Sequence, residues 1–289
     1  MAHADRLPAA RLMGGIPPTA LVLLGIVSVQ VGAAFAKQLF TVAGSAGTVT
    51  LRLVMAALIL VAIWRPTLRL DRRTLLTVLV YGTVLAAMNL CFYAALARIP
   101  LGAAVTIEFL GPLAVAVAGS RRWLDGLWVL LAGAGVVLLT GFQGGLLWTG
   151  VLFALAAGAF WAGYILVTAK LGSQTSDGQG LALAMVVGAV IALPFGITSA
   201  GTAMLDPLIL AAGFAVALMS SVIPYSLELE ALRRMPPRVF GILMSMEPVV
   251  AAIAGLLLLG EELKPAQWVA VCCVVIASIG STRTAKPDV

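Results

Sequence analysis

The chain has 289 residues, of which 62% are apolar and only 10% are charged. A soluble protein of this length needs a charged outer surface that this composition cannot supply, so we predict an all-α membrane protein that crosses the bilayer several times. The net charge of +6 does not indicate a nucleic-acid partner, because the basic residues lie in short segments between apolar stretches, where membrane topology explains them.

Metal sites, haem sites and histidine-based catalytic sites are not expected. The only histidine, His3, lies ahead of the first apolar stretch. Cys91, Cys272 and Cys273 lie inside apolar stretches, without the spacing of a metal site or a disulfide framework. We therefore predict no cofactor and no metal.

Ten apolar stretches in the sequence are predicted to cross the bilayer as helices. In chain order they cover residues 18–38, 46–64, 74–97, 98–119, 124–141, 149–171, 181–199, 207–232, 234–255 and 265–281. Residues 1–17 and 283–289 are polar tails. The spans fall into two groups of five, residues 18–141 and residues 149–282.

The distribution of basic residues predicts the orientation. With the N-terminus in the cytoplasm, the tails and even-numbered loops hold about fourteen Lys and Arg residues, and the odd-numbered loops hold about three. Both termini are therefore expected in the cytoplasm. Five spans per group then place the two groups in the membrane in opposite senses.

An internal duplication supports this division. Residues 98–119 and 234–255 align at a constant offset of about 136 residues, which superposes an arginine, two prolines and a glycine. The aligned pairs are Arg98 with Arg234, Pro100 with Pro236, Pro112 with Pro248, and Gly119 with Gly255. The predicted fold is ten transmembrane helices in two inverted five-helix repeats, an architecture that recurs in transporters with a central binding site.

Each repeated stretch contains one carboxylate beside a proline. Glu108 lies four residues before Pro112, which cannot donate to the Glu108 carbonyl group, and Glu247 directly precedes Pro248. An ionised side chain at this depth costs several kcal/mol unless it faces protein or water. We expect both glutamates to face a central cavity; the alternative is that each only fixes helix packing.

Other polar residues inside the spans are candidate substrate contacts. Arg52 either holds a substrate carboxylate, pairs with Glu108 or extends to the outer interface, and Lys37 either assists Arg52 or extends to that interface. Four neutral residues could contact substrate or join helices: Gln30, Asn89, Tyr93 and Tyr225. Glu230 is expected to pair with Arg233 or Arg234 on the surface of its helix.

Several stretches together resemble the EamA-type members of the drug/metabolite transporter superfamily, most of all their bacterial threonine and homoserine exporters. They are Ser28-Val29-Gln30-Val31-Gly32-Ala33, Leu51-Arg52-Leu53, Met88-Asn89, Glu108-Phe109, Gly111-Pro112-Leu113, Pro224-Tyr225-Ser226-Leu227-Glu228 and Met244-Ser245-Met246-Glu247-Pro248. The resemblance implies two five-helix repeats and export of small amino acids across the bacterial inner membrane, driven by the proton-motive force.

The sequence therefore predicts a transporter and not an enzyme. Its repeats would open a central cavity to each side in turn, with breaks at Pro112, Pro224 and Pro248 as gating points. Arg52, with or without Lys37, would bind the carboxylate of an amino acid, while Glu108 or Glu247 would bind its ammonium group and carry a proton.

Three alternatives stay open at this point. The same fold could export aromatic amino acids, purines or drugs. An intramembrane enzyme or a channel fits less well, because the sequence offers no nucleophile with a base and a channel leaves the paired Glu-Pro stretches unexplained. Whether the chain forms a homodimer is also open.

Overall fold

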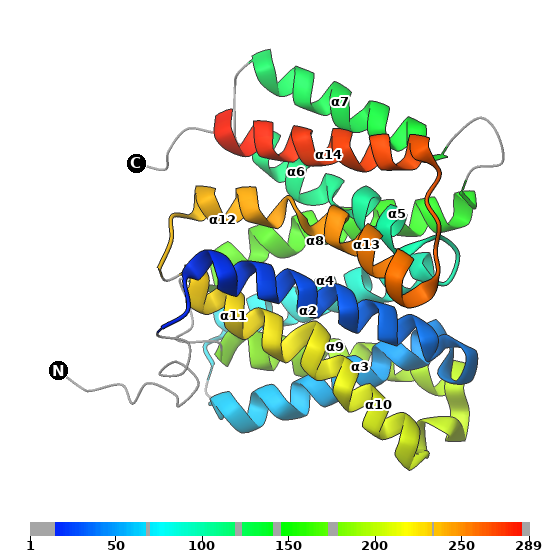
Figure 1. Ribbon diagram of the computed structural model, residues 1–289. Coiled ribbons are helices and arrows are strands. Elements are labelled where there is room, and N and C mark those ends of the chain that lie inside the picture. The colour runs from blue at the N-terminus through cyan, green and yellow to red at the C-terminus, as the bar shows by residue number, and fades with distance from the viewer. Residues whose placement is uncertain are drawn as a thin grey trace.

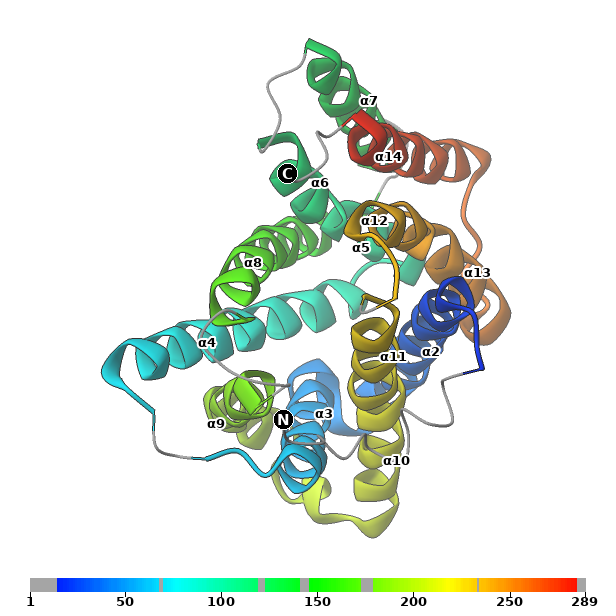
Figure 2. The same cartoon turned by 90° about the vertical axis from the view of Figure 1, so that its left-hand side faces the viewer.

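The computed structural model describes residues 15–67, 70–118, 123–140, 146–172, 179–232 and 234–284. All regular structure in these ranges is helical. Most of the helices run roughly parallel to one direction, and α2 begins at the same end of the bundle at which α14 ends (Figure 1); α4 crosses that direction (Figure 2).

Each predicted span is present as a helix or as a pair of helices in the described ranges. The first five are α2 (Pro18–Gln38), α3 (Phe40–Trp64), α4 (Arg72–Leu96), α5 (Leu101–Glu108) with α6 (Leu110–Ala118), and α7 (Trp123–Thr140). The others are α8 (Trp148–Gly172), α9 (Gln179–Ala200) with the 3-10 turn η1 (Gly201–Leu205), α10 (Pro207–Ala217) with the π turn η2 (Leu218–Val222) and α11 (Ile223–Leu232), α12 (Pro237–Met244) with α13 (Glu247–Leu259), and α14 (Pro265–Thr284).

The helices have the length and surface of membrane spans. Nine spans in the described residues are long and apolar enough to cross a bilayer, while the apolar part of α7, Gly126–Leu139, is shorter. Large apolar side chains point outward; Leu208, Leu257 and Leu130 are each more than 70% exposed. A surface of this kind needs lipid around it, so the chain is a multi-pass membrane protein.

The second span has one feature that was not predicted. It was expected to begin near residue 46, and α3 continues from there to Trp64, but a short helical segment starting at Phe40 precedes it, joined through Gly44 with a φ of 67° and a ψ of 169°. Only glycine adopts this conformation without strain. The kink lets the chain turn from α2 into α3 without a separate loop.

Three helices break beside the prolines predicted as gating points. The first break lies at Phe109, between α5 and α6, and the second at Ser245 and Met246, between α12 and α13. The third is the π turn η2, which ends just before Pro224. A proline has no N–H to donate to the carbonyl four residues earlier. Each helix is therefore broken where that backbone hydrogen bond is missing.

Most helices pack against one or more helices that are distant in the sequence. α3 packs on α9, α5 on α13, and α7 on α14, while α8 packs on α4, α5 and α6, and α2 packs on α11, α12 and α13. Figure 2 shows α7 and α14 together at one edge. The cavity that forms the candidate site is lined by residues of α2, α3, α4, α5, α6, α8, η2, α11, α12, α13 and α14.

Candidate functional site

A cavity of about 560 Å³ lies between the two halves of the chain. That volume is in the range of small-molecule sites. Its walls are mainly apolar, with Trp161 and Phe109 among them. Its charged and amide side chains are Gln30, Arg52, Asn89, Glu108, Glu228 and Glu247, and its hydroxyl-bearing side chains are Tyr164, Ser220, Tyr225, Ser278 and Thr282. The cavity therefore brings together a cation and three carboxyl groups that are far apart in the sequence.

Arg52 of α3 supplies the cation and is held by the π turn. Its Nη2 donates to the carbonyl oxygen of Ser220 over 2.8 Å, and its Nε donates to the Ser221 hydroxyl over 3.1 Å. Pro224 cannot engage the Ser220 carbonyl, so the break in the helix provides an acceptor for the guanidinium group. The Arg52 guanidinium also lies 5.6 Å from the centre of the Tyr93 ring, whose hydroxyl accepts from Nη1.

These contacts use three of the five N–H donors of Arg52. Arg52 is only 6% exposed, so the alternative in which it extends to the membrane surface is wrong. It makes no ion pair with Glu108 in the structure, since its bonds go to Ser220, Ser221 and Tyr93. Its two remaining donors leave room for an additional acceptor, such as a carboxylate.

Gln30 and Glu247 form a second polar centre. Gln30 Nε2 of α2 donates to Glu247 Oε1 over 3.1 Å, and both residues are buried. The other oxygen of each side chain, Gln30 Oε1 and Glu247 Oε2, is buried without a partner. Unpaired buried acceptors are costly, so a donor group that reached these two oxygens would stabilise the pair.

Glu108 lines the cavity at the end of α5. It is 7% exposed and receives no hydrogen bond from the described residues. Behind it, the Glu108 backbone carbonyl packs on Gly158 of α8, where an added Cβ would lie 2.7 Å from the carbonyl oxygen. The first break thus rests directly on α8 through a glycine.

Comparisons with known proteins identify the family of this chain. The chain is 42% identical over 275 residues to proteins named threonine/homoserine exporter RhtA from Salmonella typhimurium and Escherichia coli, covering 94% of this chain and 93% of each relative. The family model described as "EamA-like transporter family" matches residues 148–283 of this chain. This chain belongs to the EamA-like transporter family.

Two weaker similarities accompany these. The uncharacterized transporter YwfM of Bacillus subtilis is 26% identical over 127 residues, which cover 44% of this chain and 43% of that protein. A solved structure described as "Crystal structure of protein" superposes with a TM-score of 0.61 at 18% identity, over 92% of this chain and 97% of that one. At that identity the likeness concerns the fold alone. Membership of the family makes the chain a membrane transporter and not an enzyme.

The structure brings most of the sequence-predicted residues of this EamA-like transporter to the cavity. Asn89 lines it, although Asn89 Nδ2 donates to the Leu85 carbonyl of its own helix over 2.8 Å. Pro112 and Pro224 also line it, but Pro248 does not. Tyr93 is fully buried behind Arg52 and supports that side chain instead of lining the cavity.

Lys37 is the predicted residue that the structure places elsewhere. It does not line the cavity, and its Nζ contacts Glu261 and the carbonyl oxygen of Ile99. The role of Lys37 as a partner of Arg52 in substrate binding therefore has no support from the geometry. Glu230 forms the expected ion pair with Arg234, so that prediction is confirmed.

Two polar features of the cavity were not predicted. Glu228 lines the cavity one turn after Pro224, and its spacing from that proline was the available signal. The hydroxyl of Ser220 is buried without a partner beside Arg52. It lies in a π turn, and the sequence alone gives no indication of that turn.

Proposed function

We propose that this transporter exports small amino acids of the threonine and homoserine kind across the bacterial inner membrane, in exchange for protons. The names of its 42% identical relatives support the substrate class. The cavity supports the chemistry, because a zwitterionic amino acid needs a cation for its carboxylate and an anion for its ammonium group. The observation that carries the proposal is the pair of buried acceptors on Gln30 and Glu247 in the same cavity as Arg52.

The proposed fold is ten spans in two inverted five-helix repeats. The helix pairs support it: α3 with α9, α5 with α13, and α7 with α14 each join two equivalent spans of the two repeats, and the α4–α8 pair has its counterpart in the pairing of α11 with α2. The broken helices run in opposite directions, since α5 and α13 share one end of the bundle while α6 and α12 share the other (Figure 1).

Helix caps add a further correspondence. Asp71 accepts from the backbone N–H groups of Arg73 and Thr74 at the start of α4, and Asp206 accepts from those of Leu208 and Ile209 at the start of α10. The two caps lie about 135 residues apart, close to the offset of the duplicated stretches. A duplicated repeat explains why the same cap recurs before the third and the eighth span.

In the proposed bound state, the substrate carboxylate accepts from the free donors of Arg52 and from the Ser220 hydroxyl. The substrate ammonium group donates to Glu247 Oε2 and Gln30 Oε1, the two buried acceptors without a partner. Charge-assisted hydrogen bonds of this kind are about twice as strong as neutral ones. They would offset the cost of removing a zwitterion from water.

Glu108 is the proposed proton carrier. It ends α5, where the negative end of the helix dipole disfavours a carboxylate, whereas Glu247 begins α13, where the positive end favours one. Exchange of one inward proton for one neutral zwitterion moves one charge. A potential of 100 mV then supplies about 2.3 kcal/mol, and each unit of pH difference adds about 1.4 kcal/mol.

The proposed orientation places both termini in the cytoplasm. The cavity is lined by Leu232 of α11 and by Phe240 and Gly241 of α12, toward the end of the bundle at which α2 begins. At the other end, α5 packs closely on α13, where an added Cβ on Gly102 would lie 2.6 Å from the Ala252 backbone. On this proposal, the cavity opens toward the cytoplasm and is closed toward the outside.

The experiment is counterflow of labelled threonine in liposomes that contain the purified protein. We expect unlabelled threonine and homoserine to compete with the label, while aromatic amino acids and purines do not. Competition by those larger compounds alone would support export of a different metabolite by the same fold. Absence of any exchange of threonine would contradict the proposal.

A further inference from the structure

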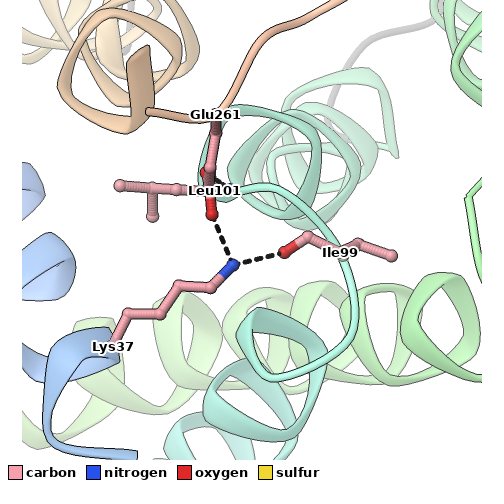
Figure 3. Close-up of polar contacts among 4 residues, drawn as sticks. All are labelled: Lys37, Ile99, Leu101 and Glu261. Carbon is pink, nitrogen blue, oxygen red and sulfur yellow. Dashed lines mark hydrogen bonds and ion pairs between the residues drawn. The ribbon is translucent and has the colours of Figure 1, made fainter. Parts of the chain in front are cut away.

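A small polar cluster closes the bundle at the end where α5 packs on α13. Lys37 Nζ, near the end of α2, lies 2.6 Å from Glu261 Oε1 and donates to the carbonyl oxygen of Ile99 over 2.9 Å. Glu261 Oε2 accepts from the backbone N–H of Leu101 over 2.7 Å. Figure 3 shows Lys37 and Glu261 meeting over the start of α5.

This cluster joins the two halves of the chain. Lys37 and Leu101 belong to the first half, and Glu261 lies in the second half, between α13 and α14. The start of α5 cannot move away from the loop that follows α13 unless Glu261 leaves the Leu101 N–H and the Lys37 bridge between Glu261 and Ile99 also breaks. The three residues therefore connect the parts that an alternating-access movement would separate.

The cluster lies directly beyond the end of the cavity. On α2, the cavity-lining residue nearest to the cluster is Ala33, one turn before Lys37. On α5, the cavity-lining residue nearest to the cluster is Val105, one turn after Leu101. Ala33, Leu101 and Val105 belong to one buried apolar cluster. Apolar packing thus fills the space between the cavity and the ion pair, and the polar contacts hold that packing in place.

Both members of the ion pair also satisfy backbone groups. Leu101 is the first residue of α5, so its N–H has no partner inside the helix, and a carboxylate at a helix start is favoured by the dipole. The side chains of Lys37 and Glu261 are only 22% and 16% exposed. Gly255 faces Glu261, and an added Cβ there would lie 2.8 Å from Oε2, so the surroundings are shaped to fit this carboxylate.

We propose that Lys37, Glu261 and the Leu101 N–H form a latch that holds the outer mouth of the cavity shut and opens when substrate leaves. The latch rests on the proposed alternating access and orientation. It gives Lys37 a function other than binding substrate. It also gives a role to Glu261, a carboxylate in the loop before α14 that takes no part in the site.

The test measures access to a cysteine placed just below the latch. Val105→Cys is introduced into a chain whose Cys91, Cys272 and Cys273 are replaced, and intact cells are treated with a membrane-impermeant thiol reagent. Lys37→Met and Glu261→Gln are then compared with the parent at equal protein levels. We expect roughly tenfold faster labelling in both, since releasing the latch enlarges a minor outward-open population.

The matched controls are Lys264→Met and Glu262→Gln, exposed charges in the same loop, which should leave labelling at the parent rate. Unchanged labelling in both latch variants would overturn the proposal. Faster labelling only in inverted vesicles would overturn its assignment to the outer side. Because this readout needs no transported substrate, a failure to transport threonine would count against the proposed function alone.

A charge exchange tests the backbone contacts of the latch. In the double variant Lys37→Glu with Glu261→Lys, the ion pair is kept, but a carboxylate faces the Ile99 carbonyl and an ammonium group faces the Leu101 N–H. We expect labelling to stay as fast as in the single variants. Recovery of the parent rate would contradict the part of the proposal that assigns the latch to backbone contacts.

Discussion

The two broken helices have the same construction but place their carboxylates differently. Glu247 begins α13, accepts a hydrogen bond from Gln30 and has one buried oxygen without a partner. Glu108 ends α5, faces the cavity and receives no hydrogen bond from the described residues. A shift of three residues relative to the aligned proline thus moves a carboxylate from a helix start to a helix end. In the proposed mechanism, Glu247 of the second half binds the substrate, and Glu108 of the first half carries the proton.

The largest effect is expected from Glu247→Gln. The substitution keeps the size of the side chain but removes the charge that faces the ammonium group, and the loss of a charged partner in a buried site costs about 3–5 kcal/mol. Threonine counterflow should fall by roughly a hundredfold or more. Normal counterflow in this variant would show that the second break does not bind the substrate.

Glu108→Gln should separate exchange from proton coupling. Because the proposed proton carrier is lost while Arg52, Gln30 and Glu247 remain, threonine counterflow at equal pH should stay within about threefold of the parent. Stimulation of threonine movement by an imposed pH gradient should disappear. If the gradient still drives threonine in this variant, Glu108 is not the carrier.

A smaller effect is expected at the contact behind the first break. Gly158→Ala places a methyl group 2.7 Å from the Glu108 carbonyl oxygen, and both groups are on backbones that cannot move easily. Overpacking of this kind should lower the Tm of the purified protein by roughly 3–10 °C. The control is Gly163→Ala on the same helix, where the nearest atom is a Val84 methyl group at 3.6 Å; its Tm should be unchanged or slightly higher.

The smallest effect is expected at the equivalent helix caps. Hydrogen bonds with Thr74 and Arg73 lower the pKa of Asp71 from its ordinary value of 3.8, so the cap stabilises the fold above that value and is lost as the pH falls through the lower folded pKa. Asp71→Ala should lower the Tm by roughly 1–4 °C at neutral pH. Asp206→Ala should do the same, and the difference between Asp71→Ala and the parent should vanish in strong acid.

The helical architecture could be predicted from the sequence because apolar length and in-span prolines are local signals. Glu108, Glu247 and Arg52 were recognised as cavity candidates because a charge at membrane depth needs a reason. The same argument also suggested that Lys37 could assist Arg52 in the cavity, but Lys37 does not line the cavity. A lysine near a helix end can reach several places, and only the tertiary structure brings Glu261 to it across 224 residues.

Other features depend on packing that a sequence does not display. The π turn at Leu218–Val222 is one of them, because proline predicts a break but not which carbonyl group Arg52 receives. The kink at Gly44 is another, since many glycines in this chain lie in ordinary helical conformation. Tyr93 could be predicted as a polar in-span residue, but its position behind Arg52 follows only from the meeting of α3 with α4.

The most direct test of the account records proton and threonine movement together, in liposomes that contain the transporter and a pH-sensitive dye. An outward threonine gradient should drive protons inward in the parent protein, and this proton movement should be absent in Glu108→Gln while labelled threonine still exchanges. Threonine efflux from the parent without any proton movement would contradict the account, as would equal proton movement in Glu108→Gln.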